Sequence, residues 1–307
     1  MKILILSPNQ INRYNWGHAL FRKEIGCQHN TLYYGEGYPK YNPKLSVPEI
    51  IKKFYKKDKP DVILTYGWRY SVPFKGLGDI TDIGKVHINV DYVREPGITK
   101  QNKFFKQNKY DLVFAITQRA LDLHIKNKVC NIVKLLPFSV DTKIYKYLYL
   151  PKENRVFASF TDRVDIYPNR RKARNALKKA GIKVTNKRII HRRLINNINR
   201  CKITLTSNNK FGSLSMRYTE TLGCGGFLLA DKPEDLELLG YEDGKHLVIY
   251  KNINDLVDKA KYYLNPKNEN ERCKIAKQGM KFVRRYHSCE QRVKDFAKII
   301  NEELGIK

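Results

Sequence analysis

The stretch Asp61-Val62-Ile63-Leu64-Thr65-Tyr66 is a short, continuous apolar run. Such runs are typical of strands that are buried on both faces, as in parallel sheets covered by helices. Comparable runs occur at residues 2–7, 31–34, 86–90, 112–116 and 132–136. Helical patterns separate the runs, for example at residues 16–25 and 48–57. This alternation predicts a doubly wound α/β domain with a parallel sheet.

A second series of the same kind follows residue 150. We expect its strands at residues 155–160, 182–185, 202–206, 226–230 and 247–250. We expect its helices at residues 169–180, 218–222, 254–264, 269–286 and 289–303. The chain has 307 residues, enough for two domains of ordinary size. We therefore predict two Rossmann-like, doubly wound domains that face each other across a cleft, at residues 1–139 and 140–285. A terminal helix in residues 286–307 can cross back to the first domain.

Composition narrows the cellular setting. No apolar run reaches the roughly 20 residues of a membrane span, and the N-terminus does not have the pattern of a signal peptide. The six cysteines form no CxxC pair, so we expect neither a disulfide framework nor a structural zinc site. We expect reduced thiols in a cytoplasmic, monomeric protein.

The charge distribution is the most informative part of the composition. The formal net charge is +29, and the excess is uneven. Residues 166–219 hold 15 lysines and arginines and no acid, whereas an even spread would place about 5 net charges there. Such a concentration indicates a polyanionic partner.

Residues 213–229 carry the most specific motif, SLSMRYTETLGCGGFLL. This segment resembles the donor-binding segment of GT-B glycosyltransferases, and is most similar to the spore-maturation-protein-like branch of the group 1 enzymes. Residues 167–170 (YPNR) resemble the Y-x-x-R element of that family, and residues 136–141 (LPFSVD) its L-P-x-x-V-D interdomain segment. The resemblance is strong over residues 136–303 and weak before them. It implies the GT-B fold and transfer of a sugar from a nucleotide-sugar donor, with UDP as the expected nucleotide.

The resemblance also assigns donor-binding residues. It implies that Glu220 accepts hydrogen bonds from the donor ribose hydroxyls; the alternative is a surface glutamate at a helix start. Arg217, one helical turn earlier, suits a diphosphate. Arg163 follows the first strand of the second domain, where a phosphate often lies, although an ion pair with Asp162 is an equal alternative. Further donor-binding candidates are Ser213, Gly223 and Gly225.

Two residues of the first domain are candidate bases. An inverting transfer requires a group that accepts the proton of the acceptor hydroxyl. Asp91 directly follows the strand at residues 86–90, and a turn-forming aspartate is the alternative. His18 follows the loop after the first strand, and a buried structural histidine is the alternative. No D-x-D pair ends a strand, so we expect no metal ion and no cofactor beyond the nucleotide-sugar co-substrate.

The charge distribution leads to a hypothesis about the acceptor. Fifteen cations exceed what one diphosphate needs, and clustered cations neutralise DNA phosphates. We therefore expect a DNA acceptor, a modified base of the kind found in viral genomes, which must be flipped out of the duplex. A viral enzyme of this kind would work in the host cytoplasm. We expect one basic face flanking the cleft, with these residues as nucleic-acid contacts: Arg170, Arg171, Lys178, Lys179, Arg192 and Arg193.

Aromatic residues near the strand ends of the first domain could stack on bases. They are Tyr14, Trp16, Tyr66, Trp68, Tyr70 and Tyr92. One alternative is an enzyme that acts on cell-surface glycans or lipid-linked sugars, with its basic face on an anionic membrane. The apolar stripe of the helix at residues 169–180 is mostly alanine, which disfavours insertion into a membrane. The other alternative is a nucleic-acid-binding module without enzymatic activity.

Overall fold

The computed structural model describes residues 1–9, 16–67, 74–90, 92, 97–158, 163–185 and 189–306. The chain forms two compact units. Unit 1 comprises Met1–Pro137 and Arg292–Lys307, and unit 2 comprises Phe138–Gln291. Each unit contains one parallel sheet with helices on both faces, which confirms the predicted α/β fold class.

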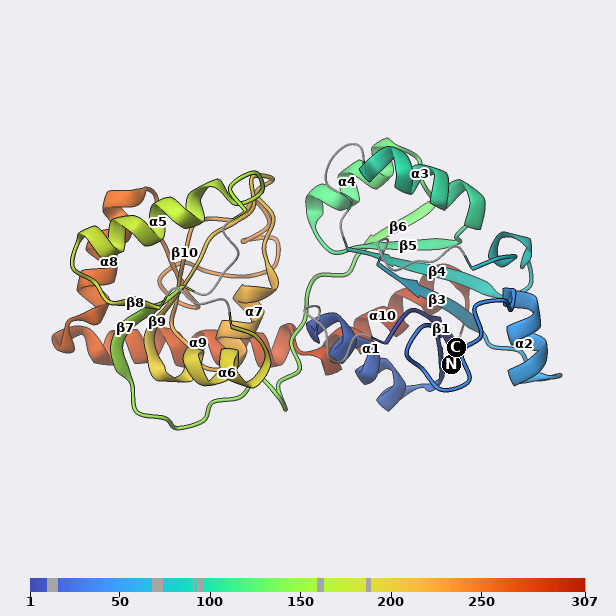
Figure 1. Cartoon of the computed structure of the whole chain (residues 1–307), viewed down its shortest axis with the longest axis horizontal. Coiled ribbons are helices and arrows are strands. Elements are labelled where there is room, and N and C mark those ends of the chain that lie inside the picture. Colours follow the sequence, from blue (N-terminus) through green and yellow to red (C-terminus); the bar gives the residue numbers. More distant parts are fainter. Residues whose placement is uncertain are drawn as a thin grey trace. The chain divides into compact units, whose positions relative to one another are not determined.

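Unit 1 contains a six-stranded parallel sheet in the order β2-β1-β3-β4-β5-β6 (Figure 1). Its strands are β1 (Lys2–Leu6), β2 (Asn30–Tyr34), β3 (Val62–Tyr66), β4 (Gly84–Asn89), β5 (Leu112–Ala115) and β6 (Ile132–Leu135). Every residue of β3 is buried, as its continuous apolar run requires. The helices that connect the strands are α1 (Trp16–Gln28), α2 (Val47–Tyr55), α3 (Gly97–Asn108) and α4 (Gln118–Lys126).

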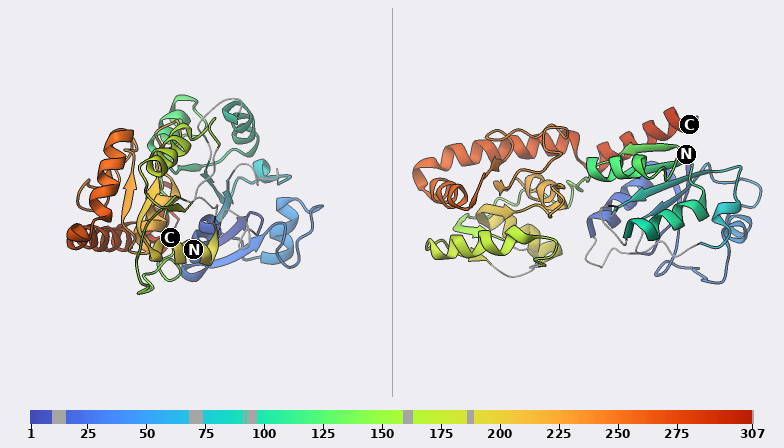
Figure 2. Two further views of the ribbon diagram at one scale, coloured as in Figure 1. Left: turned by 60° about the vertical axis from the view of Figure 1, so that its left-hand side comes forward. Right: turned by 90° about the horizontal axis from the view of Figure 1, so that it is seen from above.

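From Arg292 on, the last helix, α10 (Cys289–Leu304), belongs to unit 1. The ring of Phe296 lies 5.5 Å from that of Phe114 on β5, and Phe296 is fully buried. Lys134 on β6 forms an ion pair with Glu303 at 2.5 Å. The end of α10 lies near the N-terminus of the chain in the views of Figures 1 and 2. The C-terminal residues therefore belong to the core of unit 1.

Unit 2 contains a five-stranded parallel sheet in the order β11-β10-β9-β7-β8. Its strands are β7 (Glu153–Phe157), β8 (Val184–Thr185), β9 (Cys201–Thr206), β10 (Leu228–Ala230) and β11 (Val248–Ile249). Its helices are α5 (Pro168–Lys179), α6 (His191–Arg200), α7 (Met216–Gly223), α8 (Ile253–Leu264) and α9 (Glu269–Tyr286).

The helices of unit 2 lie on both faces of its sheet. The chain moves one way from β7 to β8 through α5, and the opposite way from β8 to β9 through α6. Because such crossovers are right-handed, α5 and α6 lie on opposite faces. Figure 1 shows α5 beside α8 on one face and α6 beside α7 on the other. The buried side chains of α5, among them Ala173 and Leu177, share a core with those of α8.

Candidate donor site

The carboxyl ends of the strands in unit 2 surround a cavity. In open parallel sheets, ligands bind beyond these strand ends. The cavity has a volume of about 960 Å³, and its lining residues come from the segments after β9, β10 and β11 and from the start of α5. Polar residues that line it include Asn169, Asn208, Asn209, Asp231, Glu234 and Tyr250.

Hydrogen bonds fix the backbone at the floor of this cavity. Asp231 accepts from the Asn208 backbone N–H at 2.7 Å and from the Ser207 hydroxyl at 3.0 Å. The Tyr218 hydroxyl on α7 donates to the Asp231 carbonyl at 2.7 Å. Burial raises the pKa of Asp231 above its ordinary value. These contacts connect the ends of β9 and β10 to α7, so the cavity is built from ordered groups.

The N-terminus of α7 has the properties of an anion site. Its first turn contains no acidic residue, and the side chain of the N-cap residue, Ser215, does not cap the helix. The buried hydroxyls of Ser213 and Ser215 make no hydrogen bond within the described part of the chain. Helix N-termini present unpaired N–H groups and a partial positive charge. This end of α7 therefore suits a phosphate group.

Glu220, one turn further along α7, is held by two neighbours. The Tyr145 hydroxyl donates to Glu220 Oε1 at 2.8 Å, and Arg217 Nη1 lies 3.1 Å from Glu220 Oε2. The Arg217 contact is ionic, because Nη1 makes no aligned hydrogen bond to any described residue. Burial, together with the charge of Glu220, raises the pKa of Tyr145 well above its ordinary value, so its hydroxyl stays a donor. A carboxylate has about four acceptor positions, so Glu220 can still accept from a ligand.

The other predicted donor residues lie in different settings. Arg163 is exposed and forms an ion pair with Asp165 at 2.8 Å, whereas Asp162 lies outside the described residues. A Cβ at Gly223 would lie 3.1 Å from Val140, and a Cβ at Gly225 would lie 3.0 Å from the Met280 sulfur. Gly225 also has a left-handed φ of 68°. These two glycines are needed for close packing at the end of α7, and their expected contact with the donor stays a prediction.

Arg170 corrects one expectation about nucleic-acid contacts. Its side chain is buried, and Nε and Nη2 both lie 3.3 Å from the Ser207 carbonyl. Its guanidinium lies 3.4 Å from the centre of the Tyr167 ring. Burial lowers the pKa of Arg170 to about 10. A side chain enclosed in this way offers no surface charge to a DNA backbone.

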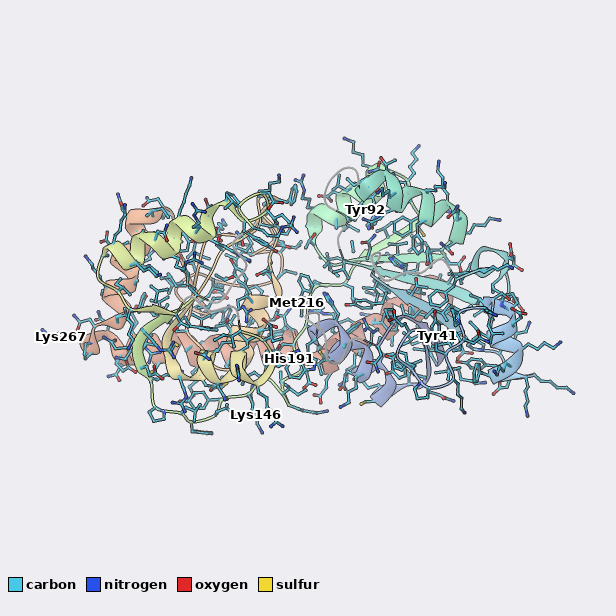
Figure 3. The ribbon with its side chains drawn as sticks, in the orientation of Figure 1. Tyr41, Tyr92, Lys146, His191, Met216 and Lys267 are labelled. Carbon is cyan, nitrogen blue, oxygen red and sulfur yellow. The ribbon has the colours of Figure 1, made fainter. Side chains whose placement is uncertain are left out.

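The remaining candidate DNA contacts are exposed but do not form one face. They are Arg171, Lys178 and Lys179 on α5, and Arg192 and Arg193 on α6. Because α5 and α6 cover opposite faces of the sheet, the expectation of a single basic face is wrong. A parallel strand ends where the next helix begins, so Arg192 and Arg193 lie at the carboxyl edge of the sheet. Figure 3 accordingly shows His191 and Met216 at the same end of unit 2, opposite Lys267.

The candidate bases belong to unit 1. His18 is buried on α1, and its Nδ1 lies 2.8 Å from the Tyr66 hydroxyl. Burial and the nearby charge of Arg22 lower the pKa of His18 to about 3. A base that works at neutral pH needs a pKa near 7, so this environment favours the structural alternative for His18. Asp91 lies outside the described residues.

The aromatic residues that we expected to stack on bases lie partly outside and partly inside the described residues. Tyr14, Trp68 and Tyr70 lie outside the described residues, and Trp16 is half-buried. Tyr66 and Tyr92 are buried, and the Tyr92 ring is stacked on His124 with 3.9 Å between ring centres. Tyr66 and Tyr92 are therefore core residues, and the expectation that they stack on bases is wrong.

Among the described residues, no group of three or more His, Cys, Asp and Glu side chains could hold a metal ion. None of the described helices is long and apolar enough to cross a membrane.

Part of the chain matches a known protein family, and the whole chain is similar to solved structures. Residues 154–298 match the family model described as glycosyl transferase-like. No protein of curated function matches the chain in sequence. A glycosyltransferase from Rickettsia africae has a TM-score of 0.66 at 13% identity, over 100% of this chain and 99% of that one.

Two further solved structures share the fold. Anabaena HepE, in complex with UDP and glucose, has a TM-score of 0.67 at 12% identity, over 98% of this chain and 100% of that one. Sucrose-phosphate synthase from Thermosynechococcus elongatus has a TM-score of 0.63 at 12% identity, over 100% of both chains. The family match at residues 154–298 shows that this protein is a glycosyltransferase, and the two parallel sheets together with these solved structures show the GT-B fold.

Proposed function

We propose that the protein transfers a sugar from a UDP-sugar to a hydroxyl group on a modified base in DNA. One observation carries the donor half of this proposal. Arg217, Glu220 and two serine hydroxyls without partners among the described residues lie on α7 or directly before it, and Gly212 at the start of this segment lines the cavity at the strand ends. HepE, which shares the fold, binds UDP and UDP-glucose.

Each group has a role in this donor site. Glu220 accepts hydrogen bonds from the ribose hydroxyls, and the base enters the cavity. Arg217 and the N-terminus of α7 bind the diphosphate. In the transfer step, Asp91 accepts the proton of the acceptor hydroxyl as its oxygen attacks the anomeric carbon, and the bond from that carbon to the diphosphate oxygen breaks. The same cations stabilise the charge on the leaving UDP, so the proposal includes no metal ion or other cofactor.

The acceptor half of the proposal rests on charge. A diphosphate needs two or three cations, and the 15 cations at residues 166–219 leave many for another anion. Arg171, Arg192 and Arg193 are exposed to solvent. Neutralising DNA phosphates with such residues releases counterions and gives affinity that does not depend on sequence. Flipping the modified base presents its hydroxyl to the enzyme.

The donor site is tested by Glu220→Ala. Losing hydrogen bonds to a charged acceptor costs about 3 kcal/mol, so the Kd for UDP should rise on the order of a hundredfold. Isothermal titration calorimetry measures it. Glu271→Ala is the matched control, because Glu271 also accepts from a tyrosine hydroxyl, that of Tyr263 at 3.0 Å. Unchanged UDP affinity in a folded Glu220→Ala protein would contradict the donor-site assignment.

The acceptor is tested by mass spectrometry of nucleosides. DNA that contains hydroxymethylated bases is incubated with the protein and a panel of nucleotide sugars, then digested. We expect one nucleoside whose mass increases by that of one sugar residue, with a UDP-sugar as the donor. If no nucleoside gains mass while a glycan or lipid-linked acceptor does, the acceptor is not DNA.

A further inference from the structure

We propose that Tyr145 is a positioning residue for the donor, whose hydroxyl orients the Glu220 carboxylate toward the ribose hydroxyls. The inference rests on the donor site proposed above. Tyr145 does not itself touch the ribose in this proposal; it acts through Glu220. Nothing in the spacing of the sequence connects the two residues, which are 75 positions apart.

The contacts of Glu220 define its orientation. Oε1 accepts from the Tyr145 hydroxyl at 2.8 Å, and Oε2 lies 3.1 Å from Arg217 Nη1. With one partner on each oxygen, rotation of the carboxylate about its last side-chain bond is restricted. The remaining acceptor positions of the two oxygens then point in fixed directions. Two neighbouring hydroxyls of a ribose are the kind of donor pair that such a carboxylate can receive.

Tyr145 is itself held rigidly. It is 2% exposed, and its backbone N–H donates to the Asp141 carbonyl at 2.8 Å. The Asp141 carboxylate accepts from the backbone of Lys143 at 2.9 Å, which closes the turn. Val140 is anchored by backbone hydrogen bonds to His287 at 3.0 Å and Cys289 at 2.9 Å. A group on so constrained a turn can fix its partner to the accuracy that a binding site needs.

Removing the Tyr145 hydroxyl would change which groups contact the Glu220 carboxylate. Oε1 would lose its neutral donor, and Arg217 would remain the charged partner among the contacts described here. The carboxylate would then rotate toward Arg217, because that cation would be its one remaining partner among the described residues. Both changes would weaken binding of the nucleotide-sugar donor. The ribose hydroxyls would lose an aligned acceptor, and Arg217 would move away from the diphosphate.

The test compares two nucleotides on Tyr145→Phe. Calorimetry gives the Kd of UDP and of 2′,3′-dideoxy-UDP, which lacks the ribose hydroxyls. We expect Tyr145→Phe to raise the Kd of UDP about tenfold, the effect of losing one hydrogen bond to a charged group. The Kd of dideoxy-UDP should rise less than about twofold. Tyr263→Phe is the matched control, since it removes a buried phenol that donates to a carboxylate of the same unit. Its affinities for both nucleotides should equal those of the unmodified protein.

A double-mutant cycle separates the possible failures. In a Glu220→Ala background, Tyr145→Phe should have no further effect on UDP affinity. An equal loss for both nucleotides, or no loss for either, would overturn the role of Tyr145. If Glu220→Ala alone leaves the preference for UDP over dideoxy-UDP intact, the proposed donor site fails. If the preference for UDP over dideoxy-UDP is lost in Glu220→Ala but kept in Tyr145→Phe, the donor-site assignment holds and Tyr145 is not part of the site.

Discussion

Tyr145–Glu220 and Tyr263–Glu271 are chemically the same pair, a buried phenol that donates to a carboxylate. Their surroundings differ. Glu220 lies beside Arg217 near the end of α7 that suits a phosphate, whereas Glu271 is exposed on α9. Each variant at the first pair therefore has a matched control at the second. The residue types alone do not distinguish a site from a surface contact.

The transfer step is tested at a single residue, Asp91. Asp91→Asn should lower the transfer rate by about 10²–10⁴-fold, because the amide cannot accept the proton of the acceptor hydroxyl. UDP affinity should not change, since the proposed donor groups lie in unit 2. Steady-state transfer assays with parallel UDP titrations measure both quantities.

His18→Gln is the comparison for that experiment. Because burial and the charge of Arg22 lower the pKa of His18 to about 3, its ring is too weak a base to take up a proton at neutral pH, and its replacement should reduce the rate much less. A rate close to that of the unmodified protein in Asp91→Asn would make Asp91 a turn residue. A large loss in a folded His18→Gln protein would make His18 the base.

Contacts between residues that are close in the sequence could be predicted, whereas contacts between residues that folding brings together could not. Arg217 and Glu220 are three positions apart on one helix, so their pairing follows from helical spacing. Tyr145 reaches Glu220 through the turn at Asp141, which the sequence does not specify. Arg170 was misplaced for a different reason. Its charge suggests a surface residue, but it lies on the buried stripe of α5 with Ala173 and Leu177.

At the scale of elements, α6 places Arg192 and Arg193 at the carboxyl edge of the sheet in unit 2, the edge of the proposed donor site. A DNA backbone bound at this edge would contact these two arginines. Arg192→Glu combined with Arg193→Glu should reduce the slope of log affinity against log salt by about 2, if each arginine neutralises one phosphate. Gel-shift titrations of duplex DNA at several salt concentrations measure this slope. The control, Lys274→Glu with Lys277→Glu on α9, changes the net charge equally at exposed positions. An equal effect in both variants would show that net charge alone determines binding.

The strands were easier to predict than α6. Parallel strands buried on both faces show as continuous apolar runs, and β3 and β9 lie where such runs predict them. α6 (His191–Arg200) was not predicted from the sequence, although Leu194, Ile195 and Ile198 form a buried stripe on it. Its other positions are mostly arginine and asparagine, and asparagine is a weak helix former. That composition obscured a short helix whose stability comes mainly from packing.

At the scale of the whole molecule, unit 1 is discontinuous in sequence. The pattern of residues 289–303 predicts a helix but does not indicate which core receives it. The buried side chains of α10, Val293, Phe296 and Ile300, are apolar and would fit either sheet by composition alone. The contact between Phe114 and Phe296 shows that they complete unit 1.

This discontinuity affects how the protein is made. During translation, residues 1–137 leave the ribosome first but lack α10, so the face of the sheet around Phe114 stays uncovered. Ribosomes add about 5–20 residues per second, so the synthesis of unit 2 delays completion of unit 1 by on the order of 10–30 s. Unit 2 has all its residues once Gln291 has emerged, and it can fold while unit 1 waits. The N-terminal half of the nascent chain is therefore the part that needs protection from aggregation in the cell.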